Sequence, residues 1–255
     1  MSIRTLQVLG WRGRRIQVFC GFPRWVEGTM LSATPRLQLD TLFVLSERGR
    51  IHSTRQPLPS PGPAFMLIRG STEVAWGVRD DVADELAGEI ADLARQEPLS
   101  PEWERPPLHA RRYQAALRGR VDWGPAFEFP EFVASPDGVV AIHDESLLGR
   151  HFSGWVAGEI EAGAAPMMAV LVDGHAVSVC FCARRSIGTA EAGLETAPAF
   201  RGRGLAARVT TAWAGAVRAS GRTPLYSTSW TNASSLAVAR KLGLRIYATN
   251  WSIEG

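Results

Sequence analysis

The C-terminal part of the sequence lacks acidic residues. No Asp or Glu occurs from residue 196 to residue 253, whereas the 255-residue chain contains 25 acidic side chains. The same tract carries eight cationic side chains: Arg201, Arg203, Arg208, Arg218, Arg222, Arg240, Lys241 and Arg245. The side chains of a cationic tract often lie only on solvated surface. A cationic tract without acidic residues also suits an anionic ligand. The net charge of +3 is too small to indicate nucleic acid as that ligand.

Cysteine and long apolar runs are scarce as well. The three cysteines, Cys20, Cys180 and Cys182, are odd in number and lack a paired-ligand spacing, which argues against a disulfide framework and a zinc site. No apolar run approaches the roughly 18 residues of a membrane-spanning helix, and the N-terminus lacks a signal-peptide core. We therefore expect a soluble cytoplasmic protein without a membrane partner and without a bound metal.

The chain contains enough apolar residues for a large core, since 45% of its residues are hydrophobic and 21% are charged. Two proline-rich breaks, residues 55–63 and 97–107, predict loops or linkers in the first half. Residues 42–54 have the pattern of a hairpin. Residues 64–70 and 74–79 are predicted as short strands, and residues 80–96 as an amphipathic helix.

The second half has a clearer pattern of predicted elements. A strand over 138–144 precedes one or two helices over 145–163, and residues 166–186 form two strands joined by Asp173-Gly174, a strong hairpin signal. A third strand ends at Pro198. Helices over 205–221 and 232–243 then alternate with strands over 224–230 and 244–253. This order predicts a mixed α/β sheet.

Residues 199–209, AFRGRGLAARV, place two glycines and three arginines at the start of the first of these helices. A glycine turn that opens into a helix N-terminus favours phosphate binding. A P-loop is excluded because Leu205-Ala206, not Lys-Ser or Lys-Thr, follows Gly204. The residues of the turn also match the consensus of a dinucleotide-binding fingerprint. That fingerprint needs an acidic residue about twenty positions later, and this position lies in the tract that contains no acid.

The third candidate ligand of this turn is coenzyme A. Arg201-Gly202-Arg203-Gly204-Leu205-Ala206 resembles the acetyl-CoA-binding signature of the GNAT N-acetyltransferases, Gln/Arg-x-x-Gly-x-Gly/Ala. A second GNAT motif is an Asn that opens a helix ending in Lys-Leu-Gly-aliphatic, and it matches residues 232–244. The order and spacing of elements agree with this family over about residues 138–255.

The resemblance implies a site for acetyl-CoA. The strand before the turn would splay from its neighbour and bind the pantetheine arm through its backbone, and the turn would offer amide N–H groups to the pyrophosphate. Asn232 is expected to cap its helix and, by resemblance, to contact coenzyme A. The predicted cofactor-binding residues are Leu194, Glu195, Thr196, Arg201, Gly202, Arg203, Gly204, Leu205, Ala206, Asn232 and Ser235.

The resemblance also implies a general base on the strand before the turn, for which Glu191 and Glu195 are the candidates. Glu191 lies nearer the usual place of that base, while both residues can equally be solvent-facing or bind a substrate cation. The family's usual tyrosine, four residues before the glycine that ends the second motif helix, is Ala239 here. Tyr226 is the candidate acid in its place, with Ser229, Ser234, Ser235 or solvent as alternatives.

These inferences predict a GNAT-like, mostly antiparallel splayed sheet with flanking helices over residues 128–255. Residues 1–127 would form an N-terminal α/β half of unknown role, possibly a degenerate acetyltransferase-like half. The chain leaves little room for the family's last strand, so we expect strands 64–70 and 74–79 to extend the sheet. The predicted activity is acetyl transfer to a primary amine, by a monomer or homodimer; a non-catalytic acyl-CoA-binding or sensing module is the alternative.

Overall fold

The computed structural model describes residues 32–99, 102–131 and 136–255. Within these residues, no helix combines the length and the apolar character that a membrane crossing requires. The elements run in the order α1 (Pro35–Leu42), β1 (Phe43–Leu45), β2 (Ile51–Thr54), β3 (Phe65–Gly70), β4 (Val74–Val78), α2 (Asp84–Ala94), α3 (Ala110–Leu117), β5 (Arg120–Glu128), β6 (Val140–Ala141), η1 (Glu145–Leu147), η2 (Ile160–Ala164), β7 (Met168–Val172), β8 (His175–Arg185), β9 (Thr189–Thr196), η3 (Pro198–Phe200), α4 (Leu205–Ala219), β10 (Thr223–Ser227), α5 (Ala233–Lys241) and β11 (Arg245–Glu254).

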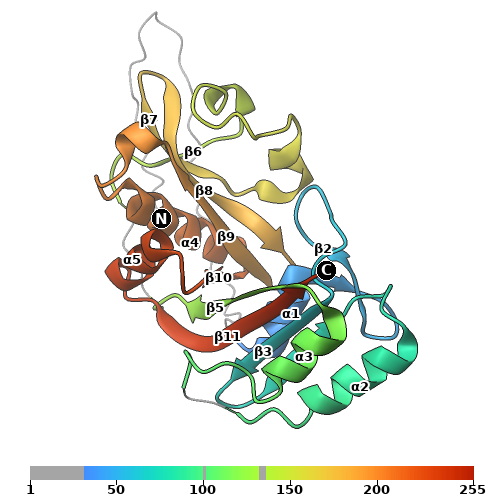
Figure 1. Ribbon diagram of the computed structural model, residues 1–255. Helices are drawn as coiled ribbons and strands as arrows, with labels where there is room; N and C mark the ends of the chain where they lie inside the picture. Colours follow the sequence, from blue (N-terminus) through green and yellow to red (C-terminus); the bar gives the residue numbers. More distant parts are fainter. Residues whose placement is uncertain (1–31, 100–101, 132–135) are drawn as a thin grey trace, which may run out of the picture.

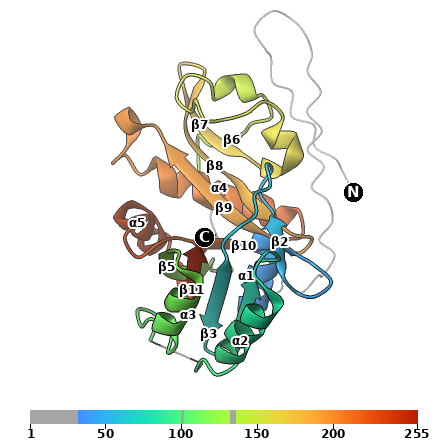
Figure 2. The same ribbon diagram turned by 45° about the vertical axis from the view of Figure 1, so that its right-hand side comes forward.

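One nine-stranded sheet forms the centre of the molecule (Figures 1 and 2). Its strands lie in the order β4-β3-β11-β5-β10-β9-β8-β7-β6, and every neighbouring pair is antiparallel except β9 and β10. The predicted mixed α/β class, with a mostly antiparallel sheet and flanking helices, is confirmed.

Strands from the first half of the chain complete this sheet. β3 pairs with β11 and β4 continues the sheet beyond it, as the sequence predicted. β5 was not predicted, and it lies between β10 and β11, pairing antiparallel with both. It therefore joins β10 and β11 into one sheet. The domain boundary predicted between residues 127 and 128 falls inside β5, and the proposed ancestry of the N-terminal half stays a prediction.

Side chains point alternately to the two faces of the sheet along β5, and their contacts show which helices lie on which face. Phe127 and Phe129 pack with α4 and α5 in one cluster, and Val121 and Trp123 pack with α2 and α3 in another. These four residues share one face because successive strand residues point to opposite sides. Ala126 belongs to the other face, where it packs in one cluster with residues of α1. Among the described α-helices, α2, α3, α4 and α5 thus lie on one face of the sheet and α1 on the other.

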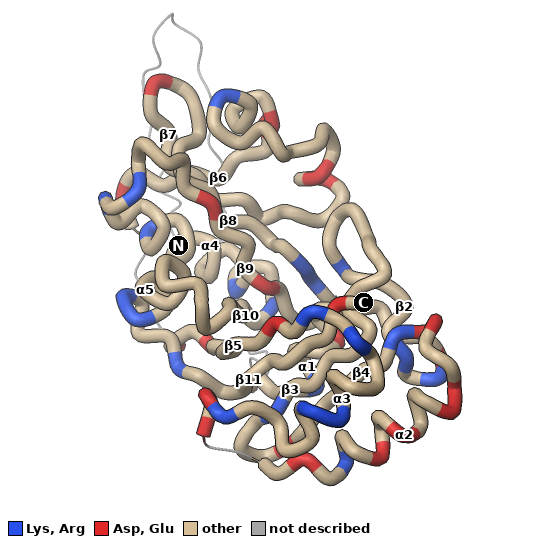
Figure 3. Tube along the Cα trace, in the orientation of Figure 1, with Lys and Arg blue, Asp and Glu red and all other residues tan. Residues whose placement is uncertain are grey.

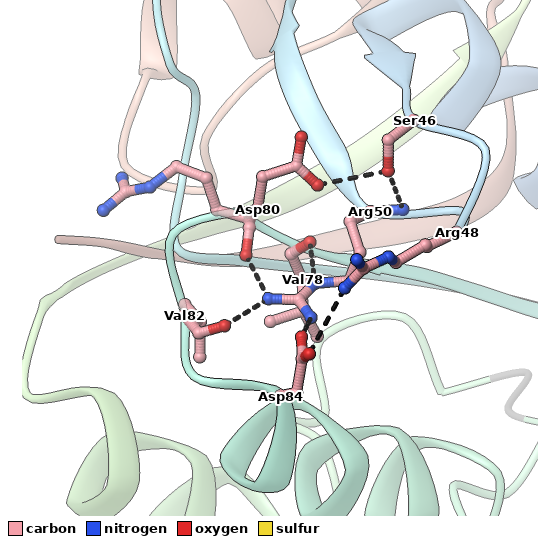
Figure 4. Close-up of polar contacts among 8 residues, drawn as sticks. Ser46, Arg48, Arg50, Val78, Asp80, Val82 and Asp84 are labelled. Carbon is pink, nitrogen blue, oxygen red and sulfur yellow. Dashed lines mark hydrogen bonds and ion pairs between the residues drawn. The ribbon is translucent and has the colours of Figure 1, made fainter.

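The β1–β2 hairpin packs on the α1 face and is held there by Arg50 (Figure 4). Its guanidinium donates hydrogen bonds to the carbonyls of Val78 at 3.2 Å and Arg79 at 2.7 Å, and it pairs with Asp84 at 3.0 Å. These contacts tie the hairpin to the end of β4 and the start of α2. They also position Phe43, which borders a pocket described below.

The helices predicted over 145–163 are largely wrong. The structure has only the 3₁₀ turn η1 and the short π-helical segment η2 there, separated by turns and bends. The segment contains Gly149, Gly154, Gly158 and Gly163, and glycine is costly in a helix interior because it loses the most backbone entropy. Gly163 has φ +156°, which is incompatible with a helix.

Candidate active site

A cleft of about 860 Å³ opens where β9 leads into α4, and we call it the α4 cleft. The end of β9, the turn before α4, the first residues of α4 and one side of α5 form its walls. Its lining residues are His151, Phe152, Leu194, Glu195, Thr196, Ala197, Pro198, Phe200, Arg201, Gly202, Gly204, Leu205, Ala206, Ala207, Asn232, Ser234, Ser235, Ala237, Val238 and Lys241. Nearly all of the predicted cofactor-binding residues are brought together here; Arg203 is not among the lining residues.

The cleft begins at a splay between β9 and β10. The two strands pair in parallel only from Thr189 opposite Thr223 to Glu191 opposite Leu225. Beyond this point β10 pairs with β5 alone, whereas β9 continues to Thr196 and pairs only with β8. In the described chain, one backbone edge of residues 192–196 therefore has no strand partner. Such an edge offers N–H and C=O groups to an extended ligand.

The turn before α4 exposes backbone donors to the cleft. Gly202 and Gly204 have φ values of +75° and +73°, which favour glycine. Gly204 is the N-cap, no side chain of the described residues caps α4, and the first turn contains no acid. The first amide N–H groups of the helix thus have no intrahelical partner and carry the positive end of its dipole. The turn is built to accept an anionic group.

Three cationic side chains lie around this turn in different ways. Arg201 lines the cleft, and its Nε donates to the Thr196 carbonyl at 3.1 Å. Arg203 stacks over the Phe200 ring at 5.0 Å and donates to the Ala199 carbonyl. Lys241 lines the cleft from the end of α5, where its Nζ would lie 2.8 Å from a Cβ at Gly204. Figure 3 shows cationic stretches of the chain near α4 and α5.

Lys241 was not among the predicted site residues. The signal for it was present, because it is the single lysine of the chain and belongs to the Lys-Leu-Gly segment that ends the second motif helix. Its position at the end of α5 indicated only a favourable interaction with the helix dipole. The tertiary fold brings it against the start of another helix, where its charge faces the same turn.

The start of α5 forms the wall opposite β9. The Oδ1 atom of Asn232 accepts a hydrogen bond from the backbone N–H of Ser235 at 3.1 Å, which confirms Asn232 as the predicted helix cap. Both residues line the α4 cleft. The Tyr226 hydroxyl reaches Ser235 from β10, with a short contact to its Oγ atom and a 3.3 Å hydrogen bond to its carbonyl.

Tyr226 is buried, and it lies in one core cluster with Ala239. Burial raises the pKa of its hydroxyl, while the hydrogen bond to Ser235 opposes that effect. The side chain therefore remains protonated at neutral pH. Through Ser235, its proton is one hydrogen bond away from the cleft.

The two predicted carboxylates have different surroundings. Glu195 is exposed and lines the α4 cleft, and partial burial of its carboxyl raises its pKa. Glu191 is only 4% exposed and lies at the last paired position before the splay. By strand alternation it shares the α1 face of the sheet with Glu195. It does not line the α4 cleft, which begins beyond the last paired position of β9 and β10.

Three residues that the sequence did not identify hold Glu191. Its Oε2 atom accepts a hydrogen bond from Gln38 of α1 at 2.7 Å, and its Oε1 atom accepts one from the hydroxyl of Ser227. The Tyr247 hydroxyl donates in turn to Gln38. Burial and the charge of Glu191 raise the pKa of Tyr247 well above its usual value. No cation of the described chain pairs with Glu191, so neutral donors alone hold this buried carboxylate.

A second cavity, of about 270 Å³, lies on the α1 face beside β5, and we call it the β5 pocket. It is lined by Leu42, Phe43, Thr54, Ser60, Gly62, Pro63, Met66, Asp122, Trp123, Gly124, Arg184, Ser227, Thr228, Ser229, Asn250, Ser252 and Glu254. Ser227 connects the two sites, since it borders this pocket and donates to Glu191 at the edge of the splay.

Comparison with known proteins finds one family model that is similar to part of the second half. Residues 167–251, a third of the chain, match the sequence model of the family described as GNAT acetyltransferase. No curated protein matches the chain. The match includes β7 to β10, α4, α5 and most of β11, and therefore the turn and most of the α4 cleft.

Solved structures that are similar to the chain include the following three. A putative GNAT acetyltransferase from Novosphingobium aromaticivorans has 26% identity and a TM-score of 0.45, covering 52% of this chain and 64% of its own. A GCN5-related N-acetyltransferase-like protein from Streptococcus suis has 14% identity and a TM-score of 0.45, covering 76% and 85%. A GNAT-family acetyltransferase from Colwellia psychrerythraea has 14% identity and a TM-score of 0.43, covering 71% and 76%.

Proposed function

We propose that this protein is an acetyl-CoA-dependent N-acetyltransferase acting on a primary amine, and the match of residues 167–251 to the GNAT acetyltransferase family model supports this. The observation that carries the proposal is the splay of β9 from β10 directly above an uncapped glycine turn. The two features together offer a backbone edge and an anion site to one elongated ligand. The cytoplasmic location expected from the sequence stays a prediction.

The residues of the α4 cleft fit coenzyme A. The free edge of β9 at Leu194–Thr196 would bind the pantetheine arm, and the amide N–H groups of residues 202–206 would bind the pyrophosphate. Arg201 and Lys241 add charge at the turn, where charge-assisted hydrogen bonds to phosphate oxygens are strong. When bound, acetyl-CoA supplies the acetyl group as a thioester.

Proton transfer on the acceptor side is assigned to Glu191. An amine must lose a proton to act as a nucleophile, and a positioned carboxylate can take it. Glu191 receives it through the Ser227 hydroxyl, which already donates to its Oε1 atom and borders the β5 pocket. Gln38 keeps the carboxylate aligned from the other side.

Proton transfer on the cofactor side is assigned to Tyr226 and Ser235. Burial keeps the tyrosine protonated, and its hydroxyl contacts the Ser235 hydroxyl, which lines the α4 cleft. This pair can deliver a proton into the cleft from β10. It would replace the tyrosine that the motif helix lacks, since Ala239 occupies that position within the same core cluster.

A non-catalytic acyl-CoA-binding module is the alternative, and Ala239 is the observation that favours it. Thermal-shift titration with acetyl-CoA, coenzyme A, NAD and ATP tests the cofactor, because a ligand that binds only the folded state raises its melting temperature. We expect acetyl-CoA and coenzyme A to raise the melting temperature of the protein. Stabilisation by NAD alone would overturn the proposal, and binding of acetyl-CoA with no thiol release on a panel of amines would favour the alternative.

A further inference from the structure

The β5 pocket joins the splay from the side opposite the α4 cleft. Gly124 and Asp122 of β5 lie opposite Asn250 and Ser252 of β11 on the α1 face of the sheet, while Ser227 at the end of β10 lies opposite Ala126. One end of the pocket is therefore beside Glu191 and the other end is near Asp122. Four residues of strand separate these ends, about 13 Å at the usual rise.

The end near the splay carries an unpaired cation. Arg184 lines the pocket, and it lies opposite Glu191 in the register of β8 and β9, so both side chains belong to the α1 face. Its Nε atom is buried, and no residue of the described chain accepts a hydrogen bond from the guanidinium. A buried donor without a partner is costly. An anionic ligand group at this end would satisfy it.

The far end carries two unpaired carboxylates. Asp122 and Glu254 both line the pocket, and they meet at Ser252, whose hydroxyl donates to the Glu254 carboxylate and to the Asp122 carbonyl. Within the described ranges, neither carboxylate forms an ion pair with Lys, Arg or His. In the register of β5 and β11, Asp122 lies opposite Ser252 and Glu254 lies opposite Arg120. A cationic ligand group at this end would give the two carboxylates an ion-pair partner.

A neutral hydrogen-bond acceptor lies between the two ends of the β5 pocket. The Oδ1 atom of Asn250 is buried and has no hydrogen-bond partner among the described residues, although its side chain lines the pocket. The Ser227 hydroxyl lies near the cationic end and leads to Glu191. From the splay outwards, the pocket thus presents a guanidinium, a proton-accepting hydroxyl, an amide oxygen and two carboxylates.

We propose that the β5 pocket binds the acceptor and that the acceptor is a cationic α-amino acid. Its carboxylate would pair with Arg184, its α-amine would reach Ser227 and Glu191, and its side-chain cation would pair with Asp122 and Glu254. The ammonium loses one proton through Ser227 to Glu191, and the neutral amine then attacks the thioester carbonyl. The new amide bond forms as the carbon–sulfur bond breaks, the nitrogen loses its second proton to solvent, and the leaving thiolate takes a proton from the Tyr226–Ser235 pair. This inference rests on the proposed acetyl transfer and assigns its substrate class.

The charge pattern disfavours other small amines. A diamine without a carboxylate would leave Arg184 unpaired and place a second cation near it. An apolar amino acid would leave Asp122 and Glu254 unpaired. The volume of about 270 Å³ is slightly below the range typical of drug-sized ligands, which suits a single amino acid.

The test compares matched ligands on the full chain. L-lysine, L-ornithine and L-arginine are assayed with acetyl-CoA by thiol release, beside L-lysinamide, which lacks the carboxylate, and L-norleucine, which lacks the side-chain amine. We expect kcat/KM for at least one cationic amino acid to exceed those of both analogues more than tenfold, because a site with buried polar groups rejects a ligand that leaves them unpaired.

Two variants test the two ends of the pocket. Arg184→Gln should raise KM for the preferred amino acid about 10- to 100-fold and remove its advantage over the carboxamide, while the KM of lysinamide changes less than threefold. The double variant Asp122→Asn/Glu254→Gln should remove the advantage over norleucine. Arg111→Gln, at an exposed position of α3, removes the same charge elsewhere and should match the wild type.

Calorimetric titration of the same ligands into the protein with coenzyme A separates this inference from the proposed function. Selective binding of a cationic amino acid, lost in Arg184→Gln, without acetyl transfer would retain the pocket assignment and overturn the transferase. Transfer to lysinamide or norleucine as efficiently as to lysine would overturn the pocket assignment and retain the transferase. Failure of all three cationic amino acids to bind would also overturn the assignment.

Discussion

The α4 cleft and the β5 pocket are assembled in different ways. Most of the α4 cleft comes from residues 194–207 and 232–241, two stretches that follow each other closely in the chain. The β5 pocket takes its walls from short pieces of chain between Leu42 and Glu254, including α1, β5, β8, β10 and β11. The first site is largely a local structure, whereas the second exists only in the assembled sheet.

The chemistry of each site reflects this difference. An anion site at a helix N-terminus needs only a turn, a free set of N–H groups and no nearby acid, all of which lie within a few residues. A pocket that holds a guanidinium at one end and carboxylates at the other needs strands in register. We therefore expect substitutions in the turn to affect the cofactor alone, and substitutions around β5 to affect the acceptor and stability.

The largest effect is expected in the turn. Gly204→Glu puts a side chain at a φ of +73°, with a Cβ 2.8 Å from Lys241 Nζ, and adds a negative charge where the pyrophosphate would bind. Stabilisation by acetyl-CoA should disappear, with Kd raised more than 100-fold. Gly215→Glu, at an exposed position of α4 with open space around it, is the matched control. Acetyl-CoA binding within threefold of wild type in Gly204→Glu would contradict the assignment.

The second largest effect is expected for Glu191, which lies between the α4 cleft and the β5 pocket. Glu191→Gln should lower kcat about 100-fold or more, as expected for a general base, with acetyl-CoA binding unchanged. Glu195→Gln removes a carboxylate four residues later on the same strand and should lower kcat less than fivefold. Equal losses in both variants would mean that Glu191 is not the base.

The third effect tests whether β5 holds the two halves together. A Cβ at Gly124 would lie 1.9 Å from the carbonyl oxygen of Thr228, so Gly124→Ala forces apart β5 and the chain after β10. We expect the free energy of unfolding to fall by about 1–3 kcal/mol in urea titrations. Gly88→Ala, at an exposed position of α2 with nothing nearby, should raise it by about 0.5–1 kcal/mol. An unchanged stability of Gly124→Ala would show that this contact is not required.

The smallest effect is expected on the cofactor side. Tyr226→Phe removes the hydroxyl that contacts Ser235 and should lower kcat about tenfold, which corresponds to about 1.4 kcal/mol. Tyr113→Phe is the control, since this buried tyrosine donates to Glu97 far from the cleft and its loss should reduce stability without lowering kcat. If the two variants have the same kcat, the proton comes from another donor.

Several elements could be predicted because their signals are local. Asp173 and Gly174 have φ values of +49° and +76° and join β7 to β8 in a two-residue turn, as the dipeptide indicates. Asn232 caps α5 through its own side chain. The glycine turn before α4 has the backbone that its spacing implied. None of these features depends on a residue more than a few positions away.

Other features depended on distant contacts. β5 begins with an alternating pattern but continues into a stretch buried on both faces, and its place between β10 and β11 follows from pairing with residues about 100 positions later. The donor that aligns Glu191 is Gln38, which is 153 residues away in the chain. No spacing rule connects such residues.

The sequence by itself determined the resemblance of the second half to the GNAT family, the turn that would bind a pyrophosphate and the order of most strands along the chain, because turns, caps and hydrophobic periodicity act over a few residues. Only the tertiary structure decided which strand joins β10 and β11, which carboxylate is held by neutral donors, and which charges line the second pocket. These depend on strand register, which is set by packing of the whole sheet.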